Sequence, residues 1–299
     1  MSRQHRVRGL TLAELVVLVV VLSFLVIGII LFPRRPRSRA FRMTCGVNLA
    51  SLGKAMLIYA NDYENEFPRA GGLGSSWAAR TPNWMGRNRL EAYGIDPNLR
   101  TGWQASISAS LYLLVKYAEA TPKMFVCEQD KGVREFELAA VRGVPRGFGL
   151  IDAWDFGPEP PRHVSYAYHM VYGSDKLTTN SEPGMAIASE RNPWIASPFG
   201  KARDFSKFQP DIPPFTGTSE TARLGNAIAH KGDGQNVLFL DSHVEFAKRS
   251  FCGVEDDNIY TSWKGDDKKR GTPAKFGSVP ADPNDSILVN DPAVATQGK

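Results

Sequence analysis

Hydrophobic residues form an almost unbroken run near the start of the chain, from Leu10 to Phe32, in which Glu14 is the only charged residue. At about 1.5 Å per residue, a helix over this run would be roughly 34 Å long, which is enough to cross a bilayer. An acidic residue inside such a helix costs roughly a few kcal/mol even on mild insertion scales. The pattern therefore predicts a transmembrane helix in which Glu14 either reaches headgroup water or meets a cation.

The residues that follow have the periodicity of an amphipathic helix. Apolar side chains recur at steps of four and three, on Cys45, Leu49, Leu52, Met56, Tyr59 and Tyr63. This stripe predicts a helix over about 37–62 that packs on a soluble domain, and a coiled-coil seam is the alternative. Pro33 and Pro36 lie between the two helical patterns, where missing backbone donors are expected to kink the helix.

Shorter patterns predict the remaining elements. Residues 106–120 read as a helix, residues 123–127, 165–172 and 185–190 as strands, and residues 236–246 as a hairpin that turns at Asp241-Ser242. Asp-Ser is a weaker turn former than Asp-Gly because its second position often needs a positive φ. Residues 69–104, 128–162 and 191–228 read as loops, and residues 264–299 as a loosely ordered tail.

The charge of the chain is unevenly distributed. The 299 residues carry a net charge of +5, but residues 1–42 hold eight arginines against the single acid Glu14. Anionic lipid headgroups are the natural partner of basic residues beside an apolar run, so nucleic-acid binding is not expected. Three arginines precede the run and five follow it. Taken alone, this count favours a cytoplasmic C-terminal side.

The start of the chain resembles the N-terminal segment of type IV prepilins and of the pseudopilins of type II secretion systems. Arg3, Arg6, Arg8 and Gly9 match the basic leader, and Glu14 matches the acidic residue of that family, whereas Leu10 stands where Phe or Met is usual. The resemblance implies that a prepilin peptidase cuts after Gly9 and that the new N-terminus at Leu10 is methylated. The amine of Leu10 would then pair with Glu14 of a neighbouring subunit and set the register of assembly.

Two later segments resemble a large group of pilin-like proteins. The first runs from Cys45 to Pro68 and matches at Cys45, Asn48, Leu49, Leu52, Gly53, Ala55, Tyr59, Asp62, Phe67 and Pro68. The second is the hairpin near the C-terminus, where ten residues rather than nine separate His230 from Asp241, and Ser242 replaces a glycine. Analogy with the group implies a Cys45–Cys127 disulfide, which leaves Cys252 over.

The resemblance also implies a fold and a function. The expected fold is α+β, with a long N-terminal helix (a transmembrane half plus an amphipathic half) packed on a small antiparallel sheet with long loops. The expected parts are a leader at 1–9, a transmembrane assembly helix at 10–33, an extracytoplasmic domain at 34–263 and the tail. The protein would be a non-enzymatic minor pilin or pseudopilin, anchored once in the inner membrane with its leader in the cytoplasm. Its expected partners are prepilin peptidase, other pilin or pseudopilin subunits and membrane lipids.

Other functions remain open on the sequence. Nitrogen and oxygen ligands from His230, Asp241 and His243 could hold a metal that activates water, as in a membrane-tethered hydrolase outside the cytoplasm. Acidic residues at Asp256-Asp257-Asn258 and Asp266-Asp267 could supply oxygen ligands to calcium. Otherwise no cofactor is expected. Exposed tryptophans (Trp77, Trp84 and Trp103) could bind carbohydrate.

Overall fold

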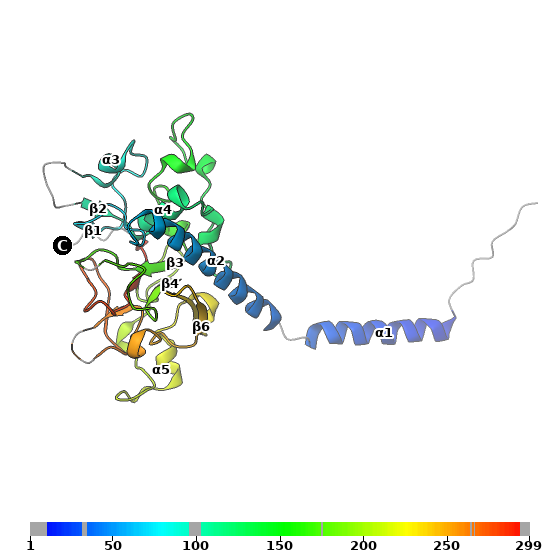
Figure 1. Ribbon diagram of the computed structural model, residues 1–299. Helices are drawn as coiled ribbons and strands as arrows, with labels where there is room; N and C mark the ends of the chain where they lie inside the picture. The colour runs from blue at the N-terminus through cyan, green and yellow to red at the C-terminus, as the bar shows by residue number, and fades with distance from the viewer. Residues whose placement is uncertain are drawn as a thin grey trace, which may run out of the picture. The chain divides into compact units, whose positions relative to one another are not determined.

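The computed structural model describes residues 11–31, 35–95, 103–174, 176–263, 265 and 267–293. The chain divides into two compact units, residues 1–40 and residues 41–299 (Figure 1). The α-helices are α1 (Leu12–Leu31), α2 (Arg35–Asp62), α3 (Arg89–Tyr93), α4 (Ile107–Tyr117) and α5 (Ser219–Arg223). The 3₁₀ turns are η1 (Pro122–Phe125), η2 (Leu138–Ala140), η3 (Leu150–Asp152), η4 (Pro160–Arg162), η5 (Phe205–Lys207), η6 (Ala229–Gly232) and η7 (Val254–Asp256).

Helix α1 begins with a reciprocal cap. The backbone N–H and the hydroxyl of Thr11 donate to Oε2 of Glu14 at 2.8 and 2.9 Å, and the N–H of Glu14 donates back to the Thr11 hydroxyl at 3.3 Å. This is the arrangement of a capping box, which satisfies donors that the first turn of a helix cannot pair internally. The hydrogen bonds from Thr11, the backbone one first, lower the pKa of Glu14.

The predicted transmembrane segment at 10–33 is wrong. In the part of the chain that the structure describes, no helix combines the length and the apolar character needed to cross a membrane. The prediction counted the whole apolar run from 10 to 32, which is longer than α1. The prediction that the protein passes once through the inner membrane is therefore wrong as well. The predicted leader at 1–9 lies outside the described residues.

The predicted fold is also wrong. One long N-terminal helix was expected, but the chain forms two, α1 and α2, and the division between the two units falls within the first turns of α2. Pro33 lies between the two helices in the sequence, and Pro36 is the second residue of α2, in the first turn, where a missing backbone donor is tolerated. The sheet is larger than expected, because its fifth strand comes from the predicted tail.

The second unit is built on a five-stranded antiparallel sheet with the order β6-β5-β4-β3-β9. Its strands are β3 (Tyr166–His169), β4 (Ala186–Glu190), β5 (Gln235–Phe239), β6 (Val244–Ala247) and β9 (Leu288–Val289). Two smaller pairs accompany it, a parallel pair of β1 (Ser75–Trp77) with β2 (Trp103–Ala105) and an antiparallel pair of β7 (Thr261–Ser262) with β8 (Thr272–Pro273).

Both faces of the large sheet are buried over β3, β4, β5 and β9, whereas the edge strand β6 is partly exposed. Alternate residues of the strands point to opposite faces, so Tyr166, Tyr168 and Leu238 join the core that contains α2 and α4. Ala167, Val237 and Phe239 join a second core on the other face. Segments without regular structure cover that second face and contribute Trp194, Phe208, Phe251 and Tyr260.

The part of α2 in the second unit packs on β5 at close range. Its stripe is buried from Cys45 to Tyr59, which confirms the predicted periodicity over this range, whereas Tyr63 lies beyond the end of α2 and is 39% exposed. A Cβ atom placed on Gly53 would lie 2.9 Å from Cδ1 of Leu238. Glycine at this position therefore allows the helix backbone to approach the strand more closely than a larger residue would.

Several other sequence-based elements are confirmed. The helix at 106–120 is α4, the strands at 165–172 and 185–190 are β3 and β4, and the hairpin at 236–246 is β5 and β6. The turn of this hairpin places Ser242 at a φ of 73°, the positive value that a glycine would adopt more easily. The strand expected at 123–127 is wrong, because η1 covers most of it and starts at Pro122. A proline at the start of a helical turn is favoured by its fixed φ.

The predicted loose tail is ordered where the structure describes it. Ile287, Leu288 and Val289 are fully buried, and β9 pairs with β3 at the edge of the sheet. Just beyond β9, the carboxylate of Asp291 accepts from the backbone N–H groups of Ile107 and Ser108 at 2.9 and 2.8 Å. A carboxylate at this place satisfies free donors at the start of α4. The sequence prediction gave too much weight to the charged and proline-rich flanks of this short apolar segment.

A second buried carboxyl beside the start of α4 predicts a pH dependence of stability. Burial, with the neighbouring Asp291 carboxylate second, raises the pKa of Asp155 to about 7. Between its unfolded pKa and this value the folded protein holds a proton that the unfolded chain releases. The free energy of unfolding should therefore fall as the pH rises through this window, by at most about 1.4 kcal/mol per pH unit for this group.

Asp155→Asn should reduce that slope, because the amide does not titrate, and Asp285, whose pKa burial also raises to about 7, should account for part of the slope that is left. Urea unfolding of the full chain at several pH values between 4 and 8 measures it. Glu182→Gln, at an exposed position, is the matched control and should leave the slope unchanged. A slope in Asp155→Asn as steep as in the wild-type chain would contradict the assignment to this carboxyl.

Candidate functional site

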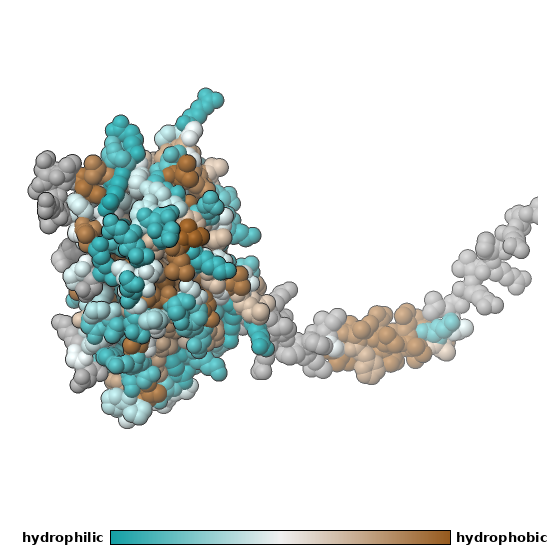
Figure 2. All heavy atoms as spheres, viewed as in Figure 1, coloured by the Kyte–Doolittle hydropathy of each residue, from teal (hydrophilic) through white to brown (hydrophobic). Residues whose placement is uncertain are grey.

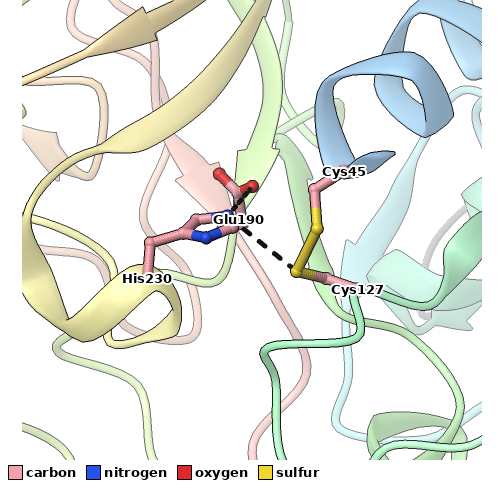
Figure 3. A group of neighbouring side chains, drawn as sticks. All are labelled: Cys45, Cys127, Glu190 and His230. Atoms are coloured by element: carbon pink, nitrogen blue, oxygen red, sulfur yellow. Dashed lines mark hydrogen bonds and ion pairs between the residues drawn. A yellow bond between two sulfur atoms is a disulfide. The ribbon is translucent and has the colours of Figure 1, made fainter. Parts of the chain in front are cut away.

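Four buried side chains from distant parts of the sequence meet at one place in the second unit. They are Cys45 from α2, Cys127 just after η1, Glu190 at the end of β4 and His230 in η6 (Figure 3). Their exposures are 0% for Cys45, Cys127 and Glu190 and 2% for His230. One ligand atom from each lies within 4.8 Å of the other three. We refer to these four residues as the Cys-Glu-His cluster.

The two cysteines of the cluster form a disulfide, and they are the pair that the resemblance implied. The bridge spans 82 positions in the sequence and ties α2 to the segment after η1. Nearby, Asn48 donates from Nδ2 to the carbonyl oxygen of Val126 at 3.0 Å and supports the same junction. Cys252 takes no part in a disulfide, and burial raises the pKa of its thiol.

His230 and Glu190 form a buried pair beside the disulfide. His230 Nε2 lies 2.8 Å from Glu190 Oε1 and 3.9 Å from the sulfur of Cys127. On the far side of the ring, Nδ1 lies 2.7 Å from Oε1 of Gln129. A carbonyl oxygen can only accept, so Nδ1 carries a hydrogen. A second proton then lies between Nε2 and Glu190.

Glu190 is held by a second residue as well. Its two oxygens accept from the backbone N–H and the side-chain Nδ2 of Asn236, at 2.5 and 2.7 Å. Asn236 belongs to β5, the strand next to β4, so the sheet itself fixes the carboxyl group. A buried carboxyl that is paired and hydrogen-bonded in this way is tolerated inside a protein.

The backbone around His230 has an unusual conformation. His230 and Lys231 adopt φ values of 53° and 60°, and Gly232 follows at 69°. The left-handed region costs residues with a side chain roughly 1–2 kcal/mol each and is rarely occupied by neighbours in sequence. Asn226 and Arg223 donate to the carbonyl oxygen of Gly232 and hold this turn in place. The turn directs His230 inward, toward Glu190 and the disulfide (Figure 3).

A pocket of about 420 Å³ borders the cluster. His230 and Gln129 belong to its wall, together with a buried ion pair in which Arg191 Nε lies 3.0 Å from Asp130. Burial raises the pKa of Asp130, and Arg191 opposes this shift. The apolar part of the wall comes from Phe41, Ile195, Phe199 and Ile228. The cluster itself is closed by the disulfide, so its two sulfurs provide no thiolate in this state.

The structure does not bring the three predicted metal ligands together. His230 precedes β5 and lies in the cluster, whereas Asp241 and His243 lie in the turn beyond the other end of β5. A five-residue strand separates its ends by roughly 13–17 Å, too far for one metal. Asp241 and His243 are about half exposed and hydrogen-bond to each other, and His243 stacks on Phe239. Within the described residues, His230 finds its potential ligand partners in Cys45, Cys127 and Glu190 instead.

The predicted calcium ligands do not converge either. Asp256 is exposed and pairs with Lys269 at 3.5 Å, whereas Asp257 is buried and accepts from the N–H of Ser286. Asp267 accepts from the N–H groups of Arg270 and Gly271 within its own turn. Asp266 lies outside the described residues.

Of the other predicted residues, Glu14 caps α1 in the first unit, and Gly9 and Leu10 lie outside the described residues. The expectation that Trp77 is exposed is wrong. It is 8% exposed, and its Nε1 donates to Asp291.

Sequence reasoning missed Glu190 and Gln129 as parts of the site. Glu190 ends the apolar stretch Met185-Ala186-Ile187-Ala188-Ser189, and an acid at the end of a buried strand needs a partner. This pattern indicates that Glu190 has a partner, but it does not identify the partner as His230. Gln129 follows Cys127 by two residues and carries no signal of its own.

Comparison of the chain with protein-family models, with characterised proteins and with solved structures finds no match.

The buried His230–Glu190 pair should contribute strongly to stability. His230→Ala leaves Glu190 buried without its partner, and breaking such a pair costs about 3–5 kcal/mol. Denaturant unfolding of the disulfide-bonded protein measures this loss. His243→Ala is the matched control, since the exposed pair with Asp241 is worth about 1 kcal/mol or less. Equal losses of unfolding free energy in the two variants would show that the buried pair stabilises the protein no more than the exposed pair does.

Proposed function

We propose that the protein is a non-enzymatic filament subunit, a minor pilin or pseudopilin, that a prepilin peptidase cuts after Gly9. The mature chain would begin at Leu10 and assemble through α1 with the same helix of other subunits. The observation that carries this proposal is the surface of α1, which is apolar on every side and exposed.

The exposure of α1 extends around the whole helix. Its large apolar side chains from Leu12 to Ile27 range from 47% exposed at Val20 to 80% at Leu12. Figure 2 shows this surface as a continuous apolar stretch on the face in view. Glu14 is the only charged residue of α1. A helix that is apolar all round is stable in water only when other apolar surfaces cover it. Identical helices packed side by side provide such surfaces in a filament.

Glu14 has one role in the cap of α1 and, in the proposed filament, a second role as a charge. Its side chain already accepts two hydrogen bonds from Thr11 in the cap of α1. The proposed assembly adds a charge role, in which the carboxylate pairs with the amine of Leu10 in a neighbouring subunit. In the apolar interior of a helix bundle an unpaired carboxylate would be costly, so such pairing would fix the axial stagger of the subunits.

Processing gives the first test. Gly9→Val should leave a full-length precursor when the chain is produced together with a prepilin peptidase, because a larger side chain disturbs the cleavage site. N-terminal mass analysis measures the outcome, and the wild-type chain should begin at Leu10 with a methylated amine. Gly28→Ala is the control, since a Cβ at this position meets nothing within 4 Å, and it should be cut normally. A wild-type chain that stays uncut in the same cells would overturn the proposal.

A pair of variants separates the cap from the charge. Glu14→Gln removes the charge but keeps the cap, because glutamine serves in a capping box as well as glutamate. Thr11→Val removes the hydrogen bonds of the hydroxyl in the cap, at a cost of about 1 kcal/mol to the helix, and keeps the charge and the backbone hydrogen bond to Glu14. Glu14→Gln should be processed normally and lose incorporation beside wild-type subunits, whereas Thr11→Val should be incorporated. Quantification of each variant in sheared filaments measures this. The reverse result would assign Glu14 to the cap alone.

A further inference from the structure

The Cys-Glu-His cluster contains the atoms of a zinc site whose two sulfurs are bonded to each other. Zinc prefers four ligands drawn from cysteine sulfur, histidine nitrogen and carboxylate oxygen, in a tetrahedron with bonds of about 2.0–2.3 Å. Such bonds place neighbouring ligand atoms about 3.3–3.8 Å apart. The four ligand atoms of the cluster already lie within 4.8 Å of one another, and His230 Nε2 is 3.9 Å from the sulfur of Cys127. We propose that reduction of the Cys45–Cys127 disulfide converts this cluster into a binding site for one Zn²⁺ ion.

The conversion is balanced in electrons and protons. A dithiol reductant gives two electrons and two protons to the disulfide, which becomes two thiols while the reductant becomes a disulfide. Zinc then displaces both thiol protons and the proton that lies between His230 Nε2 and Glu190. Three protons leave for one ion bound. The hydrogen on Nδ1 of His230 stays in place, since that nitrogen faces Gln129 and not the cluster.

The residues around the cluster already orient its ligands. Histidine ligands of metals usually donate their other ring nitrogen to a carbonyl or carboxylate oxygen, which fixes the ring. Gln129 provides that acceptor for His230 at 2.7 Å. Asn236 donates twice to Glu190 and holds its carboxyl group toward the ring. The bond between the two sulfurs has to open, and His230 Nε2 and the Glu190 oxygen, now 2.8 Å apart, have to separate to about 3.3 Å.

Zinc would preserve the connection that the disulfide makes. In the oxidised state the bridge joins α2 to the segment after η1. In the zinc-bound state the same two cysteines would be joined through the ion, and β4 and η6 would be attached to them through Glu190 and His230. The ion should therefore stabilise the reduced protein, since a ligand that binds only the folded state raises its stability.

Metal analysis of the full-length protein tests the proposal. The chain is kept soluble in a mild detergent, unfolded in denaturant with a phosphine reductant to open the buried disulfide, and refolded with or without Zn²⁺. Reduced protein should refold with one zinc per chain and a raised midpoint of thermal unfolding. Protein taken through the same steps without reductant should hold no zinc. Co²⁺ in place of Zn²⁺ should give the absorption band of a cobalt–thiolate bond.

Matched variants identify the ligands. Changing both cysteines to serine (Cys45→Ser with Cys127→Ser) should abolish zinc binding, and His230→Gln or Glu190→Gln should weaken it at least tenfold. Cys252→Ser and His243→Gln change a cysteine and a histidine outside the cluster and should bind like the wild-type chain. Reduced wild-type protein that holds no zinc, folded or unfolded, overturns the proposal. Binding that persists in His230→Gln but disappears in Cys252→Ser overturns it as well.

Discussion

The second unit depends on one packing constraint, the burial of both faces of its five-stranded sheet. Helices α2 and α4 cover one face, and irregular segments that contribute Trp194, Phe208 and Tyr260 cover the other. Because both faces are covered over the central strands, β4 is buried at all five positions and carries its polar end, Glu190, into the interior. A carboxyl group in that place needs partners, and Asn236 and His230 provide them. The site therefore follows from the way in which the sheet is covered.

The same constraint explains where the disulfide lies. The close approach of α2 to β5 at Gly53 brings Cys45, two turns earlier on the same stripe, to the end of the sheet where Glu190 lies. A bridge between residues 82 positions apart is expected to raise the free energy of the unfolded chain by about 4.5 kcal/mol, because it restricts its conformations. The disulfide and the buried His230–Glu190 pair thus lie together, where four segments of the chain come into contact. This is why a change at His230 should affect both the stability of the sheet and the packing of α2.

The sequence predicts the helices and strands of this protein better than it predicts the contacts between distant segments. The stripe from Cys45 to Met56 and the hairpin around Ser242 follow from periodicity and turn chemistry, which are local properties. Strand β9 escaped prediction because two residues owe their strand conformation to pairing with β3, more than one hundred positions away. The partners predicted for His230 are wrong, since Asp241 and His243 are close to each other in sequence, while Glu190 is close to His230 only in space. Long-range pairing of this kind leaves no periodic signal in a single chain.

In the first unit, the hydrogen bonds at the start of α1 are complete, but the apolar side chains of the helix are exposed. Thr11 and Glu14 complete the hydrogen bonds at the start of α1, so nothing in the cap itself requires a partner. A cap would be equally well served by glutamine, however, and explains neither the charge nor the apolar side chains that surround the rest of the helix. Each exposed valine or leucine of α1 gains roughly 1–2 kcal/mol when it is covered, and the gain is shared by every copy in a bundle. In the proposed bundle, which would exclude water, the charge of Glu14 would have to be neutralised, and this single charge of α1 would then set how the copies align.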